Sequence, residues 1–138
     1  MIIISIAINN NYSIKPFLQT INKTIFTKNM NFYENTIIVR QDLASKDLKD
    51  LKDKYNKIID DTSGKVLKIE EWGLLNFVSK IKNYNKGHYI HFKFEGNKDT
   101  VNEINKKIKV DRSIIRFLTV KLKKLDLEKE FFKKDKNE

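Results

Sequence analysis

The 138-residue chain contains no cysteine and only two histidines. Without cysteine it can form no disulfide framework, no thiolate zinc site and no cysteine nucleophile. His88 and His91 are three positions apart in a segment with strand character, so their side chains project from opposite faces and cannot share a metal ion. We therefore expect no metal site and no cofactor.

Glycine and proline are also scarce, with four Gly and one Pro. The glycines are too widely spaced for a Walker or dinucleotide-binding loop. No serine lies in a Gly-x-Ser-x-Gly motif, and the adjacent Glu70 and Glu71 would diverge on a strand instead of acting as an acid and base pair. The residues therefore indicate neither an enzyme nor a small-molecule substrate.

Long apolar runs are absent as well. The longest stretch without a charged residue is 1–14, which is shorter than the ~18 apolar residues that a membrane-spanning helix needs. No basic residue precedes the apolar residues 1–8, and the Asn residues that follow offer no cleavage site typical of a signal peptide. We expect neither membrane insertion nor secretion.

What the chain has in excess is positive charge. Twenty-eight Lys and Arg against 18 Asp and Glu give a net charge of +10 and a pI near 9.6. This excess favours a polyanionic partner, either nucleic acid or an anionic membrane surface. Since 25 of the 28 basic residues are Lys, a lysine-rich composition bias is the alternative explanation.

The two ends of the chain differ in composition from the part between them. Residues 1–29 hold three Lys and no acidic residue, which fits a targeting segment, a basic arm, or a translated upstream region with Met30 as the true start. Residues 123–138 hold six Lys and five acidic residues and are expected to form a solvated, charged tail. The domain itself is predicted over residues 30–122.

Within that domain the hydrophobic period alternates between that of strands and that of helices. Strands are expected at 32–40, at 65–78 with a bulge or bend at Gly73, at 88–95 and at 114–122. Helices are expected from Ser45, as a capping residue, to Asp60, and from a Thr100 to Glu103 capping box to Lys109. Residues 79–87 are expected to form a basic loop. The alternation within 88–95 places Phe92 and Phe94 in the core.

The order β-α-β-β-α-β predicts an α+β protein with the ferredoxin-like arrangement, a four-stranded antiparallel sheet with both helices on one face. An RNA-recognition motif shares this topology and stacks bases on sheet aromatics. The stretch Lys86-Gly-His-Tyr-Ile-His-Phe92 begins like its signature, but its aromatics are out of register. A small phosphatase of the same topology would need glycines in the loop after Arg40, and none is present.

Four segments resemble the bacterial-type small-subunit ribosomal protein six family, in the style of alphaproteobacterial or mitochondrial members. They are Phe32-Tyr-Glu34 with Arg40-Gln-Asp42, Lys65-Val-Leu-Lys-Ile-Glu-Glu-Trp-Gly-Leu74, the approach to Lys86-Gly-His-Tyr89, and Ile114-Ile-Arg-Phe-Leu-Thr-Val120. The resemblance covers residues 30–122. It implies a structural ribosomal protein that binds the central domain of 16S-type rRNA together with small-subunit ribosomal protein eighteen. It implies a cytoplasmic ribosome, or alternatively a mitochondrial one. A free single-strand RNA-binding module is the alternative function.

The candidate RNA-binding residues are basic or aromatic side chains on or beside these segments: Tyr33, Arg40, Lys80, Lys82, Lys86, Arg112 and Arg116. For Arg116, a stem that merely covers the strand beside Ile114 and Leu118 is almost as good an explanation. Trp72 is a candidate contact for the partner protein, although a core or sheet-edge position is more common for such a residue. After Gly73 the family commonly reads Leu-Arg-Arg-Leu-Ala-Tyr-Pro-Ile, whereas this chain has Leu-Leu-Asn-Phe-Val-Ser-Lys-Ile at 74–81. Lys80 and Lys82 partly compensate for the missing Arg pair.

Overall fold

The computed structural model describes residues 29–131. Their elements follow the order β1 (Asn31–Arg40), α3 (Ser45–Asp61), β2 (Lys65–Ile81), β3 (Tyr84–Gly96), α4 (Lys98–Val110) and β4 (Ile114–Leu122). The extension predicted at 1–29, except its last residue, and the end of the tail at 132–138 lie outside the described residues. No helix in the described part is long and apolar enough to cross a membrane.

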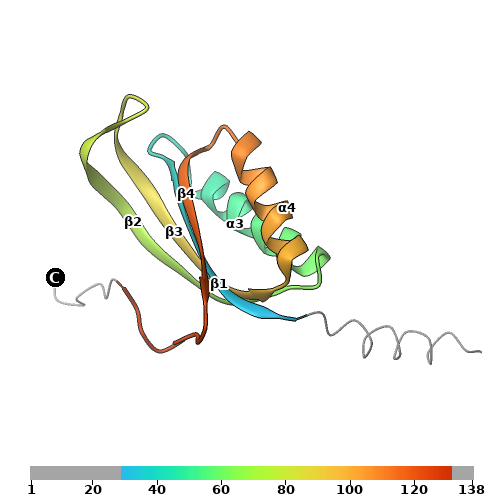
Figure 1. Ribbon diagram of the computed structural model, residues 1–138. Coiled ribbons are helices and arrows are strands. Elements are labelled where there is room, and N and C mark those ends of the chain that lie inside the picture. Colours follow the sequence, from blue (N-terminus) through green and yellow to red (C-terminus); the bar gives the residue numbers. More distant parts are fainter. Residues whose placement is uncertain (1–28, 132–138) are drawn as a thin grey trace, which may run out of the picture.

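The four strands form one antiparallel sheet in the order β2-β3-β1-β4. Both helices lie against the same face of this sheet, on the right in Figure 1, and none of the described residues forms a helix on the opposite face. The predicted ferredoxin-like β-α-β-β-α-β fold is therefore confirmed. We call the two sides of the sheet the helix face and the open face.

The core lies between the sheet and the helices. Alternate residues of β1, beginning at Tyr33 and ending at Val39, are buried on the helix face, and β3 adds Phe92 and Phe94 as predicted. The helices contribute one apolar stripe each, spaced at three or four residues as a helix with one buried face requires. These stripes consist of Leu51, Tyr55 and Ile59 on α3 and Ile104 and Ile108 on α4.

The helix starts differ in detail from the expectation. Ser45 does not cap α3, because it is the first helical residue and Ala44 occupies the cap position without a side-chain hydrogen bond. The capping box of α4 lies three residues earlier than predicted. The Asn97 side chain accepts a hydrogen bond from the backbone N–H of Thr100 at 3.0 Å, and the Thr100 hydroxyl accepts one from the Asn97 N–H at 3.3 Å. Asn97 follows Gly96, the last residue of β3, so it is the first residue free to cap the helix.

Residues 79–87 do not form the predicted loop. Strand β2 continues to Ile81 and β3 begins at Tyr84, joined by a two-residue turn in which Lys82 and Asn83 both have positive φ, at 47° and 68°. Two left-handed residues match the twist of a hairpin, so the strands can run up to the turn. The pairing of β1 with β3 ends at Arg40 and Gly87, so the hairpin projects beyond β1 as a two-stranded ribbon. The projecting hairpin is visible at the upper left of Figure 1.

Gly73 disturbs β2 as expected. Its φ is +86°, and the register of β2 against β3 shifts between Glu71 and Gly73. A left-handed residue within a strand forms a bulge, which glycine adopts without steric cost. The predicted bulge is confirmed.

The first part of the C-terminal tail is not simply solvated. The Lys93 ammonium, on the open face of β3, donates hydrogen bonds to the backbone carbonyls of Asp126 at 3.1 Å and Lys129 at 2.7 Å. Lys93 is only 1% exposed, and the neighbouring His91 3%. Residues 123–131 therefore lie over part of the open face, an association that charge composition alone does not reveal.

Candidate nucleic-acid interface

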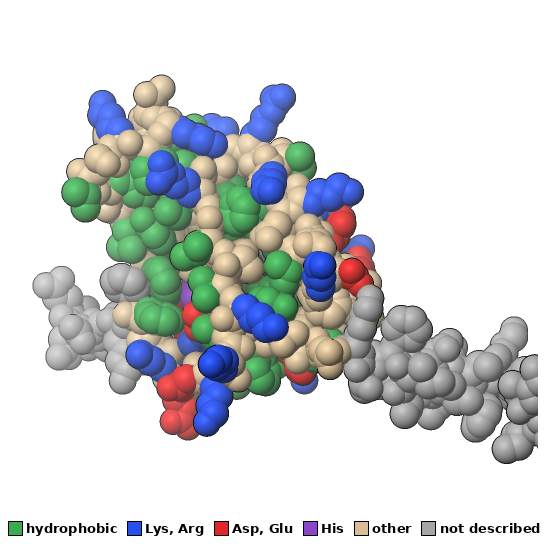
Figure 2. All heavy atoms as spheres, viewed as in Figure 1, with side chains coloured by type: hydrophobic (Ala, Val, Ile, Leu, Met, Phe, Trp, Pro, Cys, Tyr) green, Lys and Arg blue, Asp and Glu red, His purple; other side chains and the backbone are tan. Residues whose placement is uncertain are grey.

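Basic side chains gather at the end of the molecule where the β2–β3 hairpin and the α4–β4 turn lie (Figure 2). An open cleft of about 330 Å³ lies at this end. It is lined by Arg40 from the end of β1, Lys82 and Tyr84 from the hairpin, and Lys109 and Arg112 from the end of α4 and the turn after it. Four cations from three separate parts of the chain thus border one cleft.

The sheet topology brings these residues together. In an antiparallel arrangement the end of β1 lies beside the beginnings of β3 and β4, and the register places Arg40 opposite Gly87. The backbone N–H of Arg40 also donates to the carbonyl of Ser113 at 2.9 Å, which joins the end of β1 to the turn that carries Arg112. Residues far apart in the sequence therefore form one basic surface on a fixed backbone.

Arg40 is held in place by two neighbours. Its guanidinium pairs with Asp42, with the Nε to Oδ1 distance at 3.0 Å, and lies 5.8 Å from the centroid of the Tyr84 ring. The hydrogen bond from Arg40 lowers the pKa of Asp42, and the same bond raises the pKa of Arg40. Asp42 partly neutralises Arg40 and fixes its plane over Tyr84. Arg40 is therefore an oriented donor and a weaker charge than its exposed neighbours.

The other predicted cations at this end are more open. Lys80, Lys82, Lys86 and Arg112 are exposed, and none of them forms an ion pair within residues 29–131. Lys86 lies directly opposite Asn76 in the β2–β3 register. It therefore places a positive charge beside one of the two positions where the family commonly has arginine.

The turn that carries Arg112 is fixed by Asp111, which the sequence reasoning did not identify. Its carboxylate accepts hydrogen bonds from the Lys54 ammonium at 2.6 Å, the Tyr55 hydroxyl at 3.1 Å and the backbone N–H of Ser113 at 3.0 Å. Burial alone would raise the pKa of Asp111, but these bonds outweigh it and hold the pKa below its ordinary value. Burial also raises the pKa of the Tyr55 hydroxyl, with Asp111 adding to the effect. Asp111 thus ties helix α3 to the beginning of β4.

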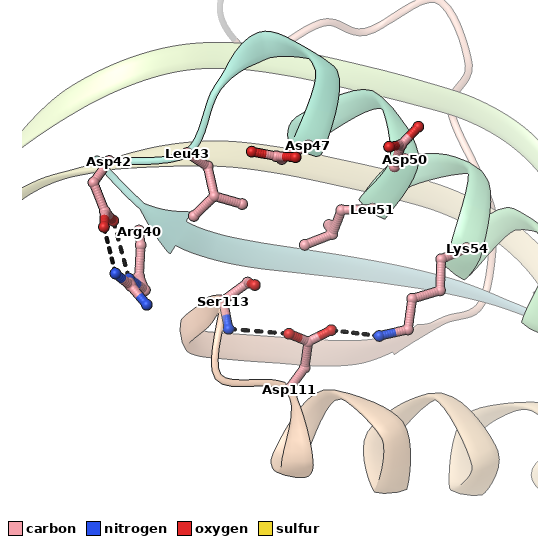
Figure 3. A pocket seen from close by; sticks show the side chains of 9 residues that line it. All are labelled: Arg40, Asp42, Leu43, Asp47, Asp50, Leu51, Lys54, Asp111 and Ser113. Carbon is pink, nitrogen blue, oxygen red and sulfur yellow. Dashed lines mark hydrogen bonds and ion pairs between the residues drawn. The ribbon is translucent and has the colours of Figure 1, made fainter.

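A second pocket beside the cleft has a different character. About 490 Å³ in volume, it is lined by four carboxylates (Asp42, Asp47, Asp50, Asp111) with Arg40, Lys54, Leu43, Leu51 and Ser113. Figure 3 shows that its two cations already face carboxylates, Arg40 with Asp42 and Lys54 with Asp111. A site with more carboxylates than cations repels phosphate. No group of residues within 29–131 has a metal-binding arrangement.

The remaining RNA-binding candidates lie elsewhere. Tyr33 is 7% exposed and stacks on Phe94 with ring centroids 5.6 Å apart. Because its ring packs in the core, it is not available to stack on a base, and we remove it from the interface. Arg116 is exposed on β4, opposite Ile38, and belongs to the open face, outside the cleft. Lys109 replaces Tyr33 as a member of the site; its position in the last turn of a predicted helix was the available signal.

Trp72 lies on the open face among aromatic rings. It stacks with His91 at 5.0 Å and with Tyr89 at 6.1 Å between centroids, and Phe77 meets Tyr89 edge-on at 6.3 Å. The indole N–H donates to Glu70 at 3.1 Å. Burial would raise the pKa of Glu70, but hydrogen bonds from Trp72 and Lys93 hold it below its ordinary value. Trp72 is thus a half-buried surface residue, separate from the basic cleft.

The described residues thus form a ferredoxin-like α+β domain with a basic cleft at one end. The family model of ribosomal protein S6 matches residues 32–121. The chain is 43% identical over 110 residues to small ribosomal subunit protein bS6 of Pelagibacter ubique, covering 79% of this chain and 91% of that protein. It is 38% identical over 99 residues to bS6 of Rickettsia prowazekii, covering 72% and 82%.

A solved structure agrees with these sequence matches. The crystal structure of 30S ribosomal protein S6 from Thermotoga maritima superposes with a TM-score of 0.65 at 26% identity, covering 67% of this chain and 88% of that one. The chain therefore belongs to the ribosomal protein S6 family. It is a structural constituent of the small ribosomal subunit and not an enzyme.

Proposed function

We propose that this chain binds small-subunit rRNA through its basic cleft, and that it does so as one half of a complex with small-subunit ribosomal protein eighteen. The observation that supports RNA binding is the convergence of Arg40, Lys82, Lys109 and Arg112 on one cleft, with Lys86 nearby. Lys82 and Arg112 form no ion pair within residues 29–131, whereas Arg40 is paired with Asp42. Cations bind phosphate by releasing its counterions, and a guanidinium can bond two phosphate oxygens at once.

The need for a partner follows from the size of the site. Residues 30–122 carry 19 basic and 13 acidic residues, so their excess charge is small for an RNA-binding protein. A few phosphate contacts give weak, salt-dependent binding, with a dissociation constant on the order of 10⁻⁴ to 10⁻⁶ M. Joining two such proteins combines their contacts on one body and strengthens binding without new contacts. Trp72, half-buried on the open face, is the proposed contact for the partner.

We further propose a bacterial cytoplasmic ribosome as the location. The relatives named above come from Pelagibacter and Rickettsia, and both are bacterial proteins of the small subunit. These names support the bacterial assignment over the mitochondrial alternative.

Filter binding to a central-domain RNA fragment tests the proposal. The chain alone should bind weakly at 150 mM salt, and addition of protein eighteen should tighten binding at least tenfold. In the complex, Arg112→Gln and Lys82→Gln should each weaken binding and reduce the slope of log K against log salt by about one. Lys98→Gln is the matched control, because Lys98 is an exposed lysine at the opposite end of α4. Tight, sequence-specific binding by the chain alone would contradict the proposal and favour a free RNA-binding module.

A further inference from the structure

Residues 123–131 form a segment, here called the strap, that crosses the open face after β4. Figure 1 shows the chain turning back below the sheet towards the β2 side once β4 has ended. The strap has a small internal turn, in which the Asp126 carboxylate accepts hydrogen bonds from the backbone N–H groups of Glu128 at 3.0 Å and Lys129 at 3.1 Å. The segment therefore has a defined conformation of its own.

Two lysines of the sheet hold the strap. Lys93 donates to two strap carbonyls and pairs with Glu70 at 3.1 Å. Lys68, its neighbour on β2, donates to the carbonyl of Leu127 at 3.0 Å and to the Glu130 carboxylate at 3.1 Å. Three backbone carbonyls are thus bound by side-chain ammonium groups.

The strap ends on the aromatic rings of the open face. The Phe131 ring lies 5.4 Å from His91 and 5.8 Å from Trp72, with the Lys93 ammonium 5.4 Å from its centroid. Phe131 is nevertheless 48% exposed and Leu127 44%. A segment held mainly by polar bonds, with little apolar burial, opens at a small cost in free energy.

The rings under the strap belong to a longer row. Phe77, Tyr89, Trp72 and His91 follow one another along β2 and β3, and Phe131 covers only the end formed by Trp72 and His91. The charges around that end balance, since Glu34 and Glu70 face His91 while Lys68 and Lys93 lie beside them. A balanced, aromatic surface attracts a polyanion weakly and suits a protein segment better than RNA.

We propose that the strap controls access to this row of rings. An extended segment of small-subunit ribosomal protein eighteen docks on Trp72 and displaces Phe131. The closed strap therefore lowers the affinity of the chain for that partner. The inference rests on the proposed partnership and adds its regulation. If the open state is only a fraction of the population, the apparent dissociation constant is the intrinsic one divided by that fraction. A variant that opens the strap should therefore bind the partner more tightly.

The test compares the full chain with its Phe131→Ala variant. Hydrogen exchange of the amides in 123–131 reports strap opening, and calorimetric titration with purified protein eighteen reports affinity. We expect faster exchange and binding about threefold to tenfold tighter for Phe131→Ala. Leu127→Ala, which shortens a 44% exposed apolar side chain of the same segment and keeps the Phe131 ring, should bind as the unmodified chain does.

The other outcomes separate control by the strap from the partnership. If both chains bind protein eighteen with equal affinity while hydrogen exchange shows that the strap is open in the variant, the strap does not control binding. The proposed partnership would then remain unaffected. Weaker binding by Phe131→Ala also overturns control by the strap, because the strap would then be part of the interface. No binding by any chain overturns the partnership and that control with it. If Phe131→Ala instead binds the RNA fragment more tightly than the unmodified chain does, in the absence of protein eighteen, the row of rings is an RNA-binding surface. That result would overturn the docking of a protein segment.

Discussion

The two faces of the sheet are built by different means. On the helix face, apolar side chains of β1 and β3 interlock with one stripe from each helix, and Ile37, Val39 and Phe94 are completely buried. On the open face Lys93 is only 1% exposed, but its surroundings are polar: its ammonium group pairs with the Glu70 carboxylate and bonds to two backbone carbonyls. Close apolar packing stabilises the helix face. On the open face, hydrogen bonds and ion pairs fix the positions of the side chains but contribute less to the free energy of unfolding.

Among substitutions on the two faces of the sheet, Phe94→Ala on the helix face should cause the largest loss of stability. Removing a completely buried aromatic ring leaves a cavity and should lower the free energy of unfolding by about 3 to 5 kcal/mol. Leu118→Ala on the open face removes a side chain that is 64% exposed, and should cost less than about 0.5 kcal/mol. Urea denaturation followed by far-UV circular dichroism measures both. Equal costs would show that the open face carries as much packing as the core.

Asp111→Ala should rank second, with a loss of about 2 kcal/mol. The substitution leaves the hydroxyl of the buried Tyr55 and the Lys54 ammonium without their shared acceptor. Since the pKa of Asp111 is lowered in the folded state, its contribution is present above the unfolded pKa and is lost as pH falls through the folded value. Denaturation curves from pH 7 to pH 3 should therefore converge for the two proteins at the acid end. A constant difference across that range would contradict the assigned ion pair.

Gly73→Val should cost about 1 to 2 kcal/mol through backbone strain alone. At Gly73 an added Cβ would meet nothing within 4 Å, but its φ of +86° is a conformation that a β-branched residue adopts at a cost. Gly73→Asn is the control, because asparagine tolerates the left-handed region better than valine does. The two variants should differ in thermal midpoint by several degrees for a domain of this size. Identical midpoints would mean that the bulge relaxes on substitution.

The smallest expected effect concerns His91 beneath the strap. Burial lowers the pKa of His91 below its ordinary value, against the opposing influence of Glu34 and Glu70. The folded state therefore binds fewer protons than the unfolded state, so stability should decline as pH falls from about 7 towards the folded pKa. His91→Gln should remove this slope, measured by urea denaturation at pH 7, 6 and 5. A slope that persists in His91→Gln would assign the titration to another group.

The sequence predicts the helix face better than the open face for a physical reason. Alternation and helical periodicity report burial against a neighbouring layer, which is why both helices were expected and Phe92 and Phe94 were correctly placed in the core. Burial of His91 and Lys93 depends on a segment about 33 to 36 residues away in the sequence, and no local pattern signals it. Tyr33 failed as a site residue because the same alternation places it in the core.

The sequence did not predict a cleft. It offered Arg40, Lys82 and Arg112 as separate candidates, and the topology places all three at the border of one cleft. The hairpin was misread as a loop because Lys82-Asn83 is not one of the glycine-containing pairs that mark two-residue turns. Asp111 was missed because its partners, Lys54 and Tyr55, lie on another helix.

The projecting hairpin is supported by fewer strands than the rest of the sheet. Beyond Gly87 the ribbon of β2 and β3 loses its third strand, and Val78 on this part is fully exposed. In this part β2 and β3 pair only with each other, and a two-stranded hairpin has little stability of its own. The ribbon carries Lys80, Lys82 and Lys86. Arg112 instead lies on a turn that Asp111 connects to helix α3 through its hydrogen bonds to Lys54 and Ser113. The positive charge at this end of the protein is thus carried on two different supports, a two-stranded ribbon and a turn that is tied to helix α3.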